Sequence, residues 1–502
     1  MRTTGTSRVR AALALAAAGA VTLAVTAALS PAASAAPVAG AVSGPFGHSG
    51  LSLTDPQGRA VVLHGLNQVY KVPPYAPSTP GFGADDAQFL QDNGFDAMRI
   101  GVIWAAVEPS PGVYDDAYLD SIAATVDTLA AHGIVSLLDF HQDLYNERFQ
   151  GEGAPAWAVH DLGLPNPALG FPWNYFGNLA EDHAWDAFWL NLKAPDGVGL
   201  QDHYAGAWRH VAQRFAARPD VVGYEVINEP WPGTLWEQCL APVISCPVFE
   251  STMTRFYRKV VSAIRTADPT TTVWIEPNVL NAQVDSSAVG DIADANIGWS
   301  FHDYCSTAEI GLGTAPCPLL DQLTIGGNRA YANSHGLPWL LTEFGATRDV
   351  VNLSSVVQLA DRNRLGWLEW AYSGNDKTSQ DSAGQALVLD PALPPTGANV
   401  VSSTLHALAE PYPQLVAGTP SSWSFTGGVF SLSYSTVKAG APLQRFPAGS
   451  ETVIAAPALQ FPAGYSVTVS GATVVSPPDA ALLRVRSLPG ATTVTVSVGP
   501  SG

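Results

Sequence analysis

Short apolar segments recur along residues 60–410 and are separated by longer stretches with helical spacing. Eight of these segments are only a few residues long and are rich in Val, Ile, Leu or aromatic side chains. They occupy residues 61–67, 97–104, 134–140, 221–227, 272–276, 297–301, 339–344 and 367–371. Runs of this kind, which lack alternating polar positions, are typical of strands that are buried on both faces, as in a parallel sheet.

The stretches between these runs have the periodicity of amphipathic helices. They include residues 116–132, 204–217, 249–267, 320–335 and 354–364. Two of them end in His-Gly, at 132–133 and at 335–336, where glycine can close a helix in the left-handed conformation. Eight strands that alternate with helices over about 350 residues predict a (β/α)8 TIM barrel of the α/β class.

Two segments interrupt this alternation and are predicted to be insertions. Residues 144–199 follow the third strand and are dense in Trp, Phe, Asn and Pro, and residues 231–247 follow the fourth strand. Loops of such length without clear periodicity are usually functional or disordered. The aromatic content argues against disorder.

The pattern changes after Pro411. Helical spacing stops, and short alternating segments follow at residues 429–434, 465–469, 481–485 and 492–498, separated by turns rich in Gly, Pro and Ser. This pattern favours a C-terminal antiparallel β-sandwich domain that packs closely against the barrel. The predicted organisation is a signal peptide over residues 1–35, the barrel over 36–410 and the β-sandwich over 411–502.

The first 35 residues have the features of an export signal. Arg2, Arg8 and Arg10 form a positive region, residues 11–29 are apolar and uncharged, and the small residues 33–35 follow as a cleavage site. An uncleaved membrane anchor is the alternative, because nineteen apolar residues nearly span a bilayer. Alanine is only weakly hydrophobic, which favours cleavage, so we expect a secreted, extracellular protein.

Composition and charge exclude several classes of protein. The 502 residues are 47% hydrophobic and 13% charged, which can fill a large core and excludes wholesale disorder. The formal net charge of −19 argues against a nucleic-acid partner, because phosphates must be met by Lys and Arg. It also argues against electrostatic docking on anionic membranes, but not against hydrophobic docking.

Four cysteines fall in two close pairs along the chain. Cys239 precedes Cys246, and Cys305 precedes Cys317. In an exported protein we expect both local pairs to be oxidised, which is the simplest of the three connectivities. A zinc site is the alternative, but neither pair has a CxxC spacing and no histidine is placed to complete a site.

The ends of the predicted strands carry the polar side chains that are candidates for a chemical role. In a (β/α)8 barrel the active site lies at the carboxyl ends of the strands. Those ends supply Asn67, Arg99, His141, Asp143, Asn228, Glu229, His302, Tyr304, Glu343 and Trp370. Charged groups at the ends of otherwise apolar strands are costly unless they are paired or functional.

Two glutamates in this set can work as a pair. Glu229 ends the fourth strand in Val-Ile-Asn-Glu-Pro, where Pro230 blocks further ladder pairing, and Glu343 ends the seventh in Leu-Leu-Thr-Glu-Phe-Gly. Two carboxylates on opposite sides of a barrel mouth can flank a glycosidic bond. Retaining hydrolysis needs them about 5–5.5 Å apart, one as the nucleophile and the other as acid and then base.

Four further residues have roles that suit such a reaction. Arg99 and Tyr304 can hydrogen-bond the nucleophile and keep it ionised. Asn228 can bind a sugar hydroxyl close to the reacting carbon, in a contact that strengthens in the transition state. Trp370 offers a flat apolar face to a sugar ring, although a lone tryptophan is more often part of a core.

The remaining polar residues fit supporting roles. His141, Asp143 and His302 can grip hydroxyls or orient the acid, and for each histidine a place in the core is the alternative. A metal site is less favoured, because no third ligand follows His141 and Asp143 at a recognisable spacing. Three glutamates within strands are predicted to be structural or supporting groups: Glu225, Glu276 and Glu369. We expect neither a metal nor a cofactor.

The ordered set resembles glycoside hydrolase family 5, a family of retaining (β/α)8 enzymes. Residues 226–230 and 342–345 resemble its acid/base and nucleophile motifs, and residues 139–143 and 228–233 are similar to those of its endoglycoceramidase branch. The resemblance covers most of residues 50–502. It implies that Glu229 is the acid/base and Glu343 the nucleophile. Candidate sugar contacts are Asn67, Lys71 and Asp143.

By this resemblance the protein is a secreted retaining endo-β-glycosidase that cleaves glycosphingolipids between glycan and ceramide by double displacement. Relatives prefer gangliosides, 6-galactosylated ceramides, simple glucosylceramide- or galactosylceramide-type lipids or steryl glucosides, and the insertion at 144–199 is expected to decide among them. We expect a monomer that contacts a lipid surface or micelle transiently.

Two alternatives stay open at this point. A β-linked polysaccharide such as cellulose or mannan is a different substrate for the same chemistry. A catalytically inactive carbohydrate- or lipid-binding protein is a different function, but such a protein has no need for a matched acid and nucleophile.

Overall fold

The computed structural model describes residues 41–240, 246–281, 287–305, 314–374 and 384–501. All of these belong to one compact unit, Ala36–Gly502. The predicted signal peptide over 1–35 lies outside the described residues. Within the described part of the chain, no helix combines the length and the hydropathy that a bilayer crossing requires.

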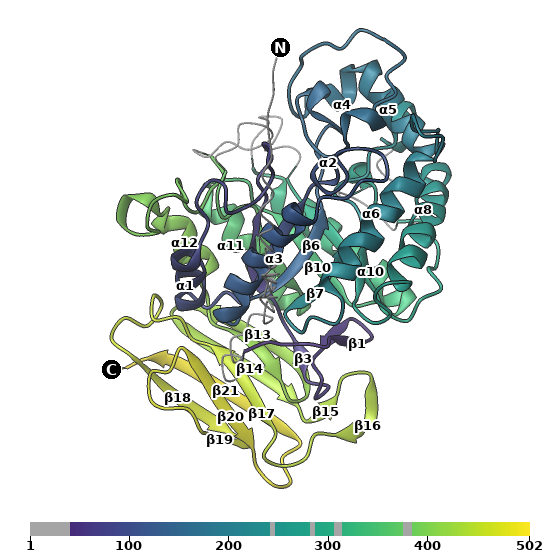
Figure 1. Cartoon of the computed structure of the whole chain (residues 1–502). Helices are drawn as coiled ribbons and strands as arrows, with labels where there is room; N and C mark the ends of the chain where they lie inside the picture. Colours follow the sequence, from purple (N-terminus) through teal and green to yellow (C-terminus); the bar gives the residue numbers. More distant parts are fainter. Residues whose placement is uncertain (1–40, 241–245, 282–286, 306–313, 375–383, 502) are drawn as a thin grey trace, which may run out of the picture. The chain divides into compact units, whose positions relative to one another are not determined.

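Eight parallel strands close into a barrel (Figure 1). Their order around the ring is β10-β11-β4-β5-β6-β7-β8-β9. The strands are β4 (His64–Gln68), β5 (Ala97–Val102), β6 (Val135–Phe140), β7 (Val221–Glu225), β8 (Val273–Ile275), β9 (Ile297–Asp303), β10 (Trp339–Phe344) and β11 (Gly366–Glu369). Each corresponds to one of the eight apolar runs, so the predicted (β/α)8 TIM barrel is confirmed.

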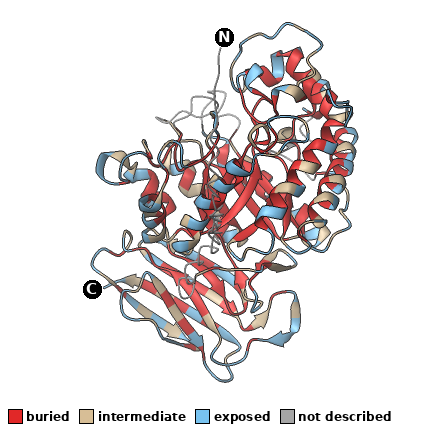
Figure 2. Cartoon of the chain, viewed as in Figure 1, coloured by how far each residue is buried: buried red, intermediate tan, exposed pale blue. Residues whose placement is uncertain are grey.

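The barrel strands are buried along their whole length (Figure 2). Both faces of a parallel sheet are covered, the inner face by side chains from the other strands and the outer face by helices. This explains why the runs show no polar alternation. Two charged groups that the barrel strands contain, Arg99 and Glu225, are paired with each other.

Helices surround the barrel. They are α1 (Ala84–Asp92), α2 (Trp104–Val107), α3 (Asp116–Ala131), α6 (Leu200–Phe215), α7 (Trp236–Cys239), α8 (Pro247–Arg265), α10 (Cys317–His335), α11 (Val350–Asn363) and α12 (Ser402–Leu408). Helix α3 starts after Asp115, whose side chain accepts a hydrogen bond from Tyr118 N–H. Helix α11 starts before the predicted residue 354, because the Asp349 carboxylate accepts hydrogen bonds from Val351 and Asn352 N–H groups.

The long insertion after β6 is more regular than its sequence pattern indicated. It contains the 3-10 turns η1 (Glu147–Phe149) and η2 (Ala156–Ala158) and the helices α4 (Trp173–Gly177) and α5 (Leu179–Trp189). The first turn of α5 buries Glu181 and Asp182 beside its apolar residues. These acids interrupt the apolar stripe, so the helical period was hidden.

Both predicted disulfides are confirmed. Cys239 pairs with Cys246 at the end of α7, and Cys305 after β9 pairs with Cys317 at the start of α10. Each bond closes a local loop on the side of the barrel where the strands end.

The C-terminal part of the chain forms antiparallel sheets, as predicted. A seven-stranded sheet contains β1 (Gly47–Ser49), β2 (Ser52–Thr54), β3 (Ala60–Val61), β12 (Tyr412–Val416), β17 (Glu451–Ala455), β20 (Leu482–Ser487) and β19 (Ala472–Val474). A four-stranded sheet contains β13 (Thr419–Thr426), β14 (Val429–Ser435), β21 (Thr493–Pro500) and β18 (Tyr465–Ser470), and a hairpin contains β15 (Val437–Lys438) and β16 (Ala441–Arg445). One apolar cluster joins the inner faces of the two larger sheets.

The apolar run at 61–67 proved to hold parts of two sheets. Val61 pairs with Leu415 of β12 in the seven-stranded sheet, whereas β4 begins only at His64 in the barrel. A run that is buried on both faces does not reveal which partner each residue takes. Strands from both sides of the predicted boundary at 410/411 therefore share one sheet, and the boundary itself stays a prediction.

The seven-stranded sheet contacts the amino ends of the barrel strands. One apolar cluster contains Ala97, Val135 and Val222 from the barrel together with Leu415 and Val453 from the sheet. The carboxyl ends of the barrel strands, where an active site is expected, therefore lie away from this contact.

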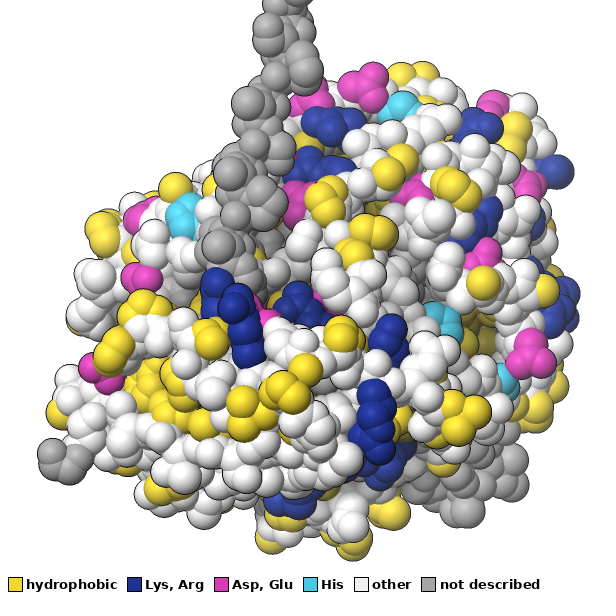
Figure 3. All heavy atoms as spheres, turned by 90° about the horizontal axis from the view of Figure 1, so that it is seen from below, with side chains coloured by type: hydrophobic (Ala, Val, Ile, Leu, Met, Phe, Trp, Pro, Cys, Tyr) yellow, Lys and Arg dark blue, Asp and Glu magenta, His cyan; other side chains and the backbone are white. Residues whose placement is uncertain are grey.

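The C-terminal sheets do not share the acidic balance of the whole chain. Residues 411–502 carry four basic side chains and two acidic ones: Lys438, Arg445, Arg484, Arg486, Glu451 and Asp479. Seen from below, Lys and Arg side chains are spread over this face among hydrophobic and uncharged ones (Figure 3). The acidic excess of the protein therefore belongs to the rest of the chain.

Candidate active site

The chain leaves β7 through a tightly held bend that ends at Glu229. The Val226 carbonyl accepts hydrogen bonds from Tyr204 Oη and Trp208 Nε1, both at 2.8 Å. Glu229 itself has a φ of +44°, and its N–H group donates to Glu276 Oε2 at 3.1 Å. A left-handed conformation is costly for a residue other than glycine and persists where neighbours enforce it, often at functional sites. These bonds fix the backbone of Glu229.

A second bend follows Glu343 at the end of β10 and places Gly345 beside Trp370. Gly345 has a φ of +101°, and a Cβ atom there would come within 3.1 Å of the Glu369 side chain. The end of β10 is tied to the end of β11, because Trp370 N–H donates to Phe344 O at 2.9 Å and Ala346 N–H donates to Trp370 O at 2.9 Å. Glycine at 345 allows this close approach.

Glu229 and Glu343 meet at His302 of β9. The His302 Nδ1 atom lies 2.8 Å from Glu229 Oε1 and 3.5 Å from Glu343 Oε2. One carboxylate oxygen of each glutamate lies within 4.8 Å of the other. This approach is compatible with the separation of about 5–5.5 Å that double displacement uses.

Arg99 of β5 is the buried cation on which four carboxylates converge. Its side chain is fully buried and pairs with Glu343, with Glu225, with Asp139 at 3.0 Å and with Glu276 at 3.5 Å. Burial opposes the charge, but these acids together raise the pKa of Arg99 well above its usual range. The guanidinium therefore stays charged and holds Glu343 in one orientation.

Two asparagines brace Arg99. Asn67 Oδ1 accepts from Arg99 Nη1 at 3.1 Å, and Asn228 Oδ1 accepts from Arg99 Nη2 at 2.8 Å. Asn67 is fully buried, and its Nδ2 donates to the Thr342 carbonyl at 2.9 Å. The structure therefore makes Asn67 a brace inside the barrel rather than the sugar contact that the resemblance implied. Asn228 Nδ2 donates to Gln142 O at 2.9 Å and keeps a second N–H for a substrate oxygen.

The protonation states around His302 follow from burial and charge. Burial lowers the pKa of His302, but the negative charges of Glu343 and Glu276 overcome this effect and raise that pKa well above its usual range. Burial raises the pKa of Glu343, while the positive charges of His302 and Arg99 and the hydrogen bond from Tyr304 Oη at 2.8 Å oppose the rise. A positive imidazolium thus stands beside both glutamates.

A second charged cluster lies beside Trp370. Lys71 forms an ion pair with Asp143, its Nζ atom lies 3.8 Å from Glu152 Oε1, and it stands 4.5 Å from the centre of the Trp370 ring. Ligand atoms of His141, Asp143 and Glu152 lie within 4.8 Å of one another, a spacing that a cation could use. Here the Lys71 ammonium supplies positive charge to the two carboxylates.

His141 connects the two clusters. Its Nδ1 atom lies 2.7 Å from Asp139 Oδ2, and its ring stacks on Trp370 with centres 5.3 Å apart and planes at 13°. Burial, together with the charge of Lys71, lowers the pKa of His141 to about 3, so the ring is neutral. Burial would raise the pKa of Asp143, but the Lys71 ammonium holds it well below its usual range.

Sequence analysis did not predict several residues of the site, or predicted only a supporting role for them. Asp139 and Glu152 were not singled out, and Glu225 and Glu276 were predicted only as supporting groups. Gln142 also escaped notice, although its Nε2 donates to the carbonyls of Asn228 and Glu229 at 3.0 and 3.1 Å. The Asp-Phe-His-Gln-Asp motif was a signal for two of these residues, but nothing in the insertion marked Glu152.

Comparison with known proteins identifies the family. The family model for cellulase (glycosyl hydrolase family 5) matches residues 55–376, and that for the glycoside hydrolase family 5 C-terminal domain matches residues 411–498. The chain belongs to glycoside hydrolase family 5, in its endoglycoceramidase branch, and is a glycoside hydrolase. The predicted resemblance is confirmed.

Individual relatives cover nearly the whole chain. Endoglycoceramidase I of Rhodococcus hoagii (strain 103S) is 31% identical over 471 residues, which is 90% of this chain and 88% of that protein. The solved structure of endo-glycoceramidase II from Rhodococcus sp. is 30% identical with a TM-score of 0.73, covering 89% of this chain and 99% of that one. Its ganglioside GM3 complex is 29% identical with a TM-score of 0.71, covering 90% and 99%.

Proposed function

We propose that this protein is an exported, retaining endo-β-glycosidase that hydrolyses the bond between glycan and ceramide in glycosphingolipids. The observation that carries the chemistry is the meeting of Glu229 and Glu343 at His302 Nδ1, 2.8 and 3.5 Å away. The substrate class is supported by the names of the relatives, endoglycoceramidases I and II, and by the ganglioside bound to the second of them.

The first step replaces the lipid by the enzyme. A Glu343 oxygen attacks the anomeric carbon and forms a glycosyl ester, while the bond from that carbon to the ceramide oxygen breaks. Glu229 donates its proton to the departing oxygen, so ceramide leaves as an alcohol. Arg99 and Tyr304 keep Glu343 ionised and aligned for the attack.

The second step returns the enzyme to its starting state. Glu229, now a carboxylate, takes a proton from water as the water oxygen attacks the anomeric carbon. The ester bond to Glu343 breaks, and the carboxylate that is released regains its partners Arg99 and Tyr304. Two inversions give net retention of configuration.

The surroundings of Glu229 support a lipid as the leaving group. Because Glu229 protonates the departing oxygen, the aglycone must lie on its side of the cleaved bond. Trp231, two residues on, packs against Tyr175 at 4.7 Å, Phe176 at 5.4 Å and Trp236 at 6.2 Å between ring centres. Phe176 remains 38% exposed. Trp231 and Tyr175 are themselves buried, so the apolar surface offered to an acyl chain here is that of Phe176 and the partly buried Trp236, whose rings are 5.4 Å apart.

Replacement of the nucleophile tests the mechanism. Glu343→Gln removes the attacking charge but keeps the shape of the side chain, so we expect turnover to fall by at least about 10³-fold while glycan binding persists. Glu369→Gln is the matched control: burial raises the pKa of Glu369 well above its usual range, so this buried acid is already neutral. Near-normal turnover of Glu343→Gln would refute the mechanism.

A substrate panel tests the aglycone separately. We expect release of intact ceramide from a ganglioside, a neutral glycosphingolipid or a galactosyl lipid, with little cleavage of cello- or manno-oligosaccharides. Faster hydrolysis of the oligosaccharides than of every glycolipid would assign the protein to polysaccharides instead.

Export and oligomeric state are parts of the same proposal. The segment 1–35 would be removed after the small residues 33–35, so the protein recovered from culture medium should begin near residue 36. Its elution volume should be that of a monomer. A recovered chain that begins at Met1 would contradict the cleavage.

A further inference from the structure

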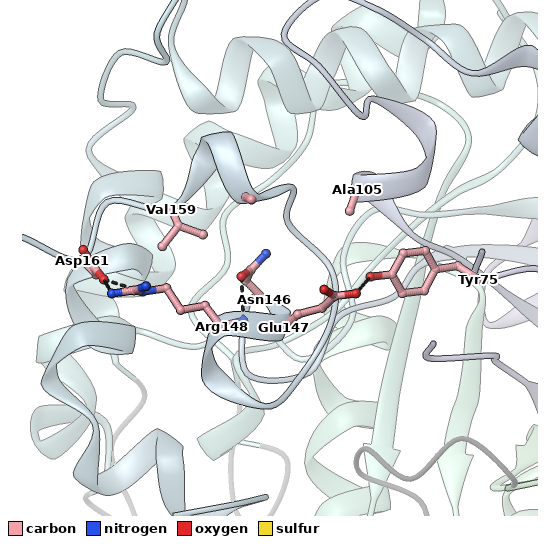
Figure 4. Close-up of a pocket in the computed structure, with 8 residues that line it drawn as sticks. Tyr75, Ala105, Asn146, Glu147, Arg148, Val159 and Asp161 are labelled. Atoms are coloured by element: carbon pink, nitrogen blue, oxygen red, sulfur yellow. Dashed lines mark hydrogen bonds and ion pairs between the residues drawn. The ribbon is translucent and has the colours of Figure 1, made fainter. Parts of the chain in front are cut away.

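A cavity of about 510 Å³ lies at the rim of the barrel, apart from the two catalytic glutamates (Figure 4). Its walls come from the segment after β4, from the start of α2 after β5, and from η1 and η2 in the insertion after β6. Its volume is within the range of about 300–1,000 Å³ that small-molecule sites occupy. We refer to it as the rim cavity.

Two residues that line the rim cavity follow closely in the chain after predicted sugar contacts. Tyr75 in its wall follows Lys71 by four residues, and Asn146 follows Asp143 by three. At about 3.3–3.6 Å per residue, the Cα atom of Tyr75 lies within roughly 14 Å of that of Lys71, and the Cα atom of Asn146 within roughly 11 Å of that of Asp143. All three segments leave the carboxyl ends of β4, β5 and β6, which is the end that carries the glutamates. A glycan that extends past Lys71 on this side of the barrel mouth can reach this cavity.

The lining offers both donors and acceptors in fixed positions (Figure 4). Tyr75 Oη donates to Glu147, and Arg148 pairs with Asp161 at 2.5 Å. Asn146 is held by its own contact, because its Oδ1 accepts from Arg148 N–H at 2.8 Å. Side chains that are already oriented by one another lose little freedom when a ligand binds. Sugar hydroxyls need such mixed partners.

The charge of the lining selects against acidic ligands. Among the described residues that line the cavity, Glu147 and Asp161 are acidic and Arg148 is basic. The single cation is already paired with Asp161, so an incoming carboxylate would face Glu147 without a free counter-charge. A neutral sugar meets no such repulsion.

We propose that the rim cavity is a binding subsite for a neutral sugar of the substrate glycan, beyond the units held near Lys71 and Asp143. This inference rests on the proposed function, because it assumes that a glycan extends from the cleaved bond across the barrel mouth. The subsite makes the enzyme prefer a neutral sugar to a sialic acid at this one position of the glycan.

Binding of free glycans tests the subsite without any need for ceramide release. In the full-length Glu343→Gln protein, calorimetry compares lactose, lactose extended by one neutral hexose, and lactose extended by sialic acid. We expect the neutral trisaccharide to bind about tenfold more tightly than lactose, and sialyl-lactose to bind no more tightly than lactose. Equal affinity for lactose and the neutral trisaccharide would overturn the proposal.

A blocking variant locates the effect in the cavity. Ala156 lines the cavity and is exposed, so Ala156→Trp fills the space without disturbing the core. It should abolish the preference for the neutral trisaccharide and leave lactose binding unchanged. Ala131→Trp, at an exposed position at the end of α3, is the matched control and should leave both affinities unchanged. A preference that survives Ala156→Trp would place the third sugar elsewhere.

A charge variant tests the selection against acids. Glu147→Gln keeps an oxygen that accepts from Tyr75 but removes the negative charge. We expect it to tighten sialyl-lactose binding several-fold with a smaller change for the neutral trisaccharide. Sialyl-lactose that binds the unmodified cavity more tightly than the neutral trisaccharide would refute the charge argument. Failure of the enzyme to cleave any glycolipid would overturn the proposed function alone, because these affinities do not depend on it.

Discussion

Arg99 shows how a single buried side chain organises a reaction centre. A guanidinium offers five N–H donors in one plane, so it can hold Glu343, Glu225, Asn67 and Asn228 at once. A lysine at this position would satisfy fewer of these partners and would leave buried carboxylates without a hydrogen bond. The orientation of Glu343, the proposed nucleophile, therefore depends on Arg99 and on the other partners that hold Arg99 in place.

Removal of one hydrogen bond to the nucleophile should change its titration. Tyr304→Phe deletes the donor at 2.8 Å from Glu343 Oε2, so the ionised carboxylate is less stabilised and its pKa rises further. The attack needs the ionised form, so the acidic limb of the profile of kcat/KM against pH should move to higher pH. We expect kcat to fall by about 10–100-fold.

The control for this prediction is a tyrosine away from the site. Tyr114→Phe, where the ring stacks on His210, should leave the pH profile in place. If Tyr304→Phe lowered kcat without a shift of the acidic limb, the hydroxyl would be orienting the substrate instead of the nucleophile.

At the scale of single residues, sequence analysis located the two candidate catalytic glutamates better than the side chains that hold them in place. Glu229 and Glu343 could be found because each ends an apolar strand, a place that polar residues rarely occupy without a role. The brace formed by Asn67 could not be predicted, because its partners lie on β5 and β10, far along the chain. Glu152 lies in an irregular stretch of the insertion, where no period marks an inward-facing position.

Among the elements, the insertion after β6 contributes aromatic side chains near Glu229, on the side where the proposed function places the lipid. Its helix α4 carries Trp173, which is 55% exposed, and Phe176, which packs on Trp231 beside Glu229. Figure 1 shows α4 and α5 at the end of the barrel away from the C-terminal sheets. An exposed indole next to an aglycone site is suited to contact with the surface of a micelle or vesicle.

Loss of this exposed indole should affect only substrates held in a lipid phase. We expect Trp173→Ser to reduce cleavage of a glycosphingolipid in vesicles by about tenfold, since less apolar surface is available for docking. Hydrolysis of a water-soluble aryl lactoside should stay within about twofold.

Leu393→Ser serves as the matched control, because Leu393 is 54% exposed and lies outside the insertion. It should alter neither rate. A similar loss on both substrates in Trp173→Ser would mean that α4 supports the fold of the site and does not dock on lipid.

Helices and strands were predicted well wherever a single pattern of hydrophobic positions dominated the segment. The barrel strands are uniformly apolar because both their faces are covered, and the long outer helices keep a single apolar stripe. Helix α5 was missed because Glu181 and Asp182 are buried in its first turn, and the run at 61–67 was read as one strand although it serves two sheets. In both cases tertiary contacts override the local pattern.

At the scale of the whole molecule, buried acids outnumber buried Lys and Arg side chains among the residues that the structure describes. Burial raises the pKa of Asp182 to about 7, of Asp361 to about 7 and of Glu410 to about 8. Burial likewise raises the pKa of Asp86 to about 6. These groups are protonated in the folded protein at a pH where the unfolded chain has already released their protons.

This imbalance predicts that the protein loses stability as the pH rises. Above about pH 6 these acids keep protons in the folded state that the unfolded chain has already released, so increasing pH favours unfolding. Buried His64 and His141, whose pKa values are lowered by burial, act in the opposite sense below pH 6.5. We expect Tm to be highest near about pH 6 and to fall by at least about 5 °C by about pH 9.

One buried acid can be tested by itself. Asp361→Asn keeps an oxygen for the hydrogen bond from Trp423 Nε1 at 2.7 Å but cannot ionise, so its Tm should fall less between about pH 6 and about pH 9. Asp127→Asn, at a side chain that is 62% exposed, should leave the slope unchanged. An unchanged slope in Asp361→Asn would show that this group does not contribute.

The sequence by itself determined the barrel, the cysteine pairs and the two glutamates, because periodicity, spacing and strand ends are local properties of a chain. Only the tertiary structure decided which partners those groups have. Arg99 gathers carboxylates from four separate strands or strand ends, and the rim cavity joins three loops, since side chains that are distant in the sequence become neighbours only when the sheet closes. Protonation states depend on the same closure, because burial and neighbouring charges set them together.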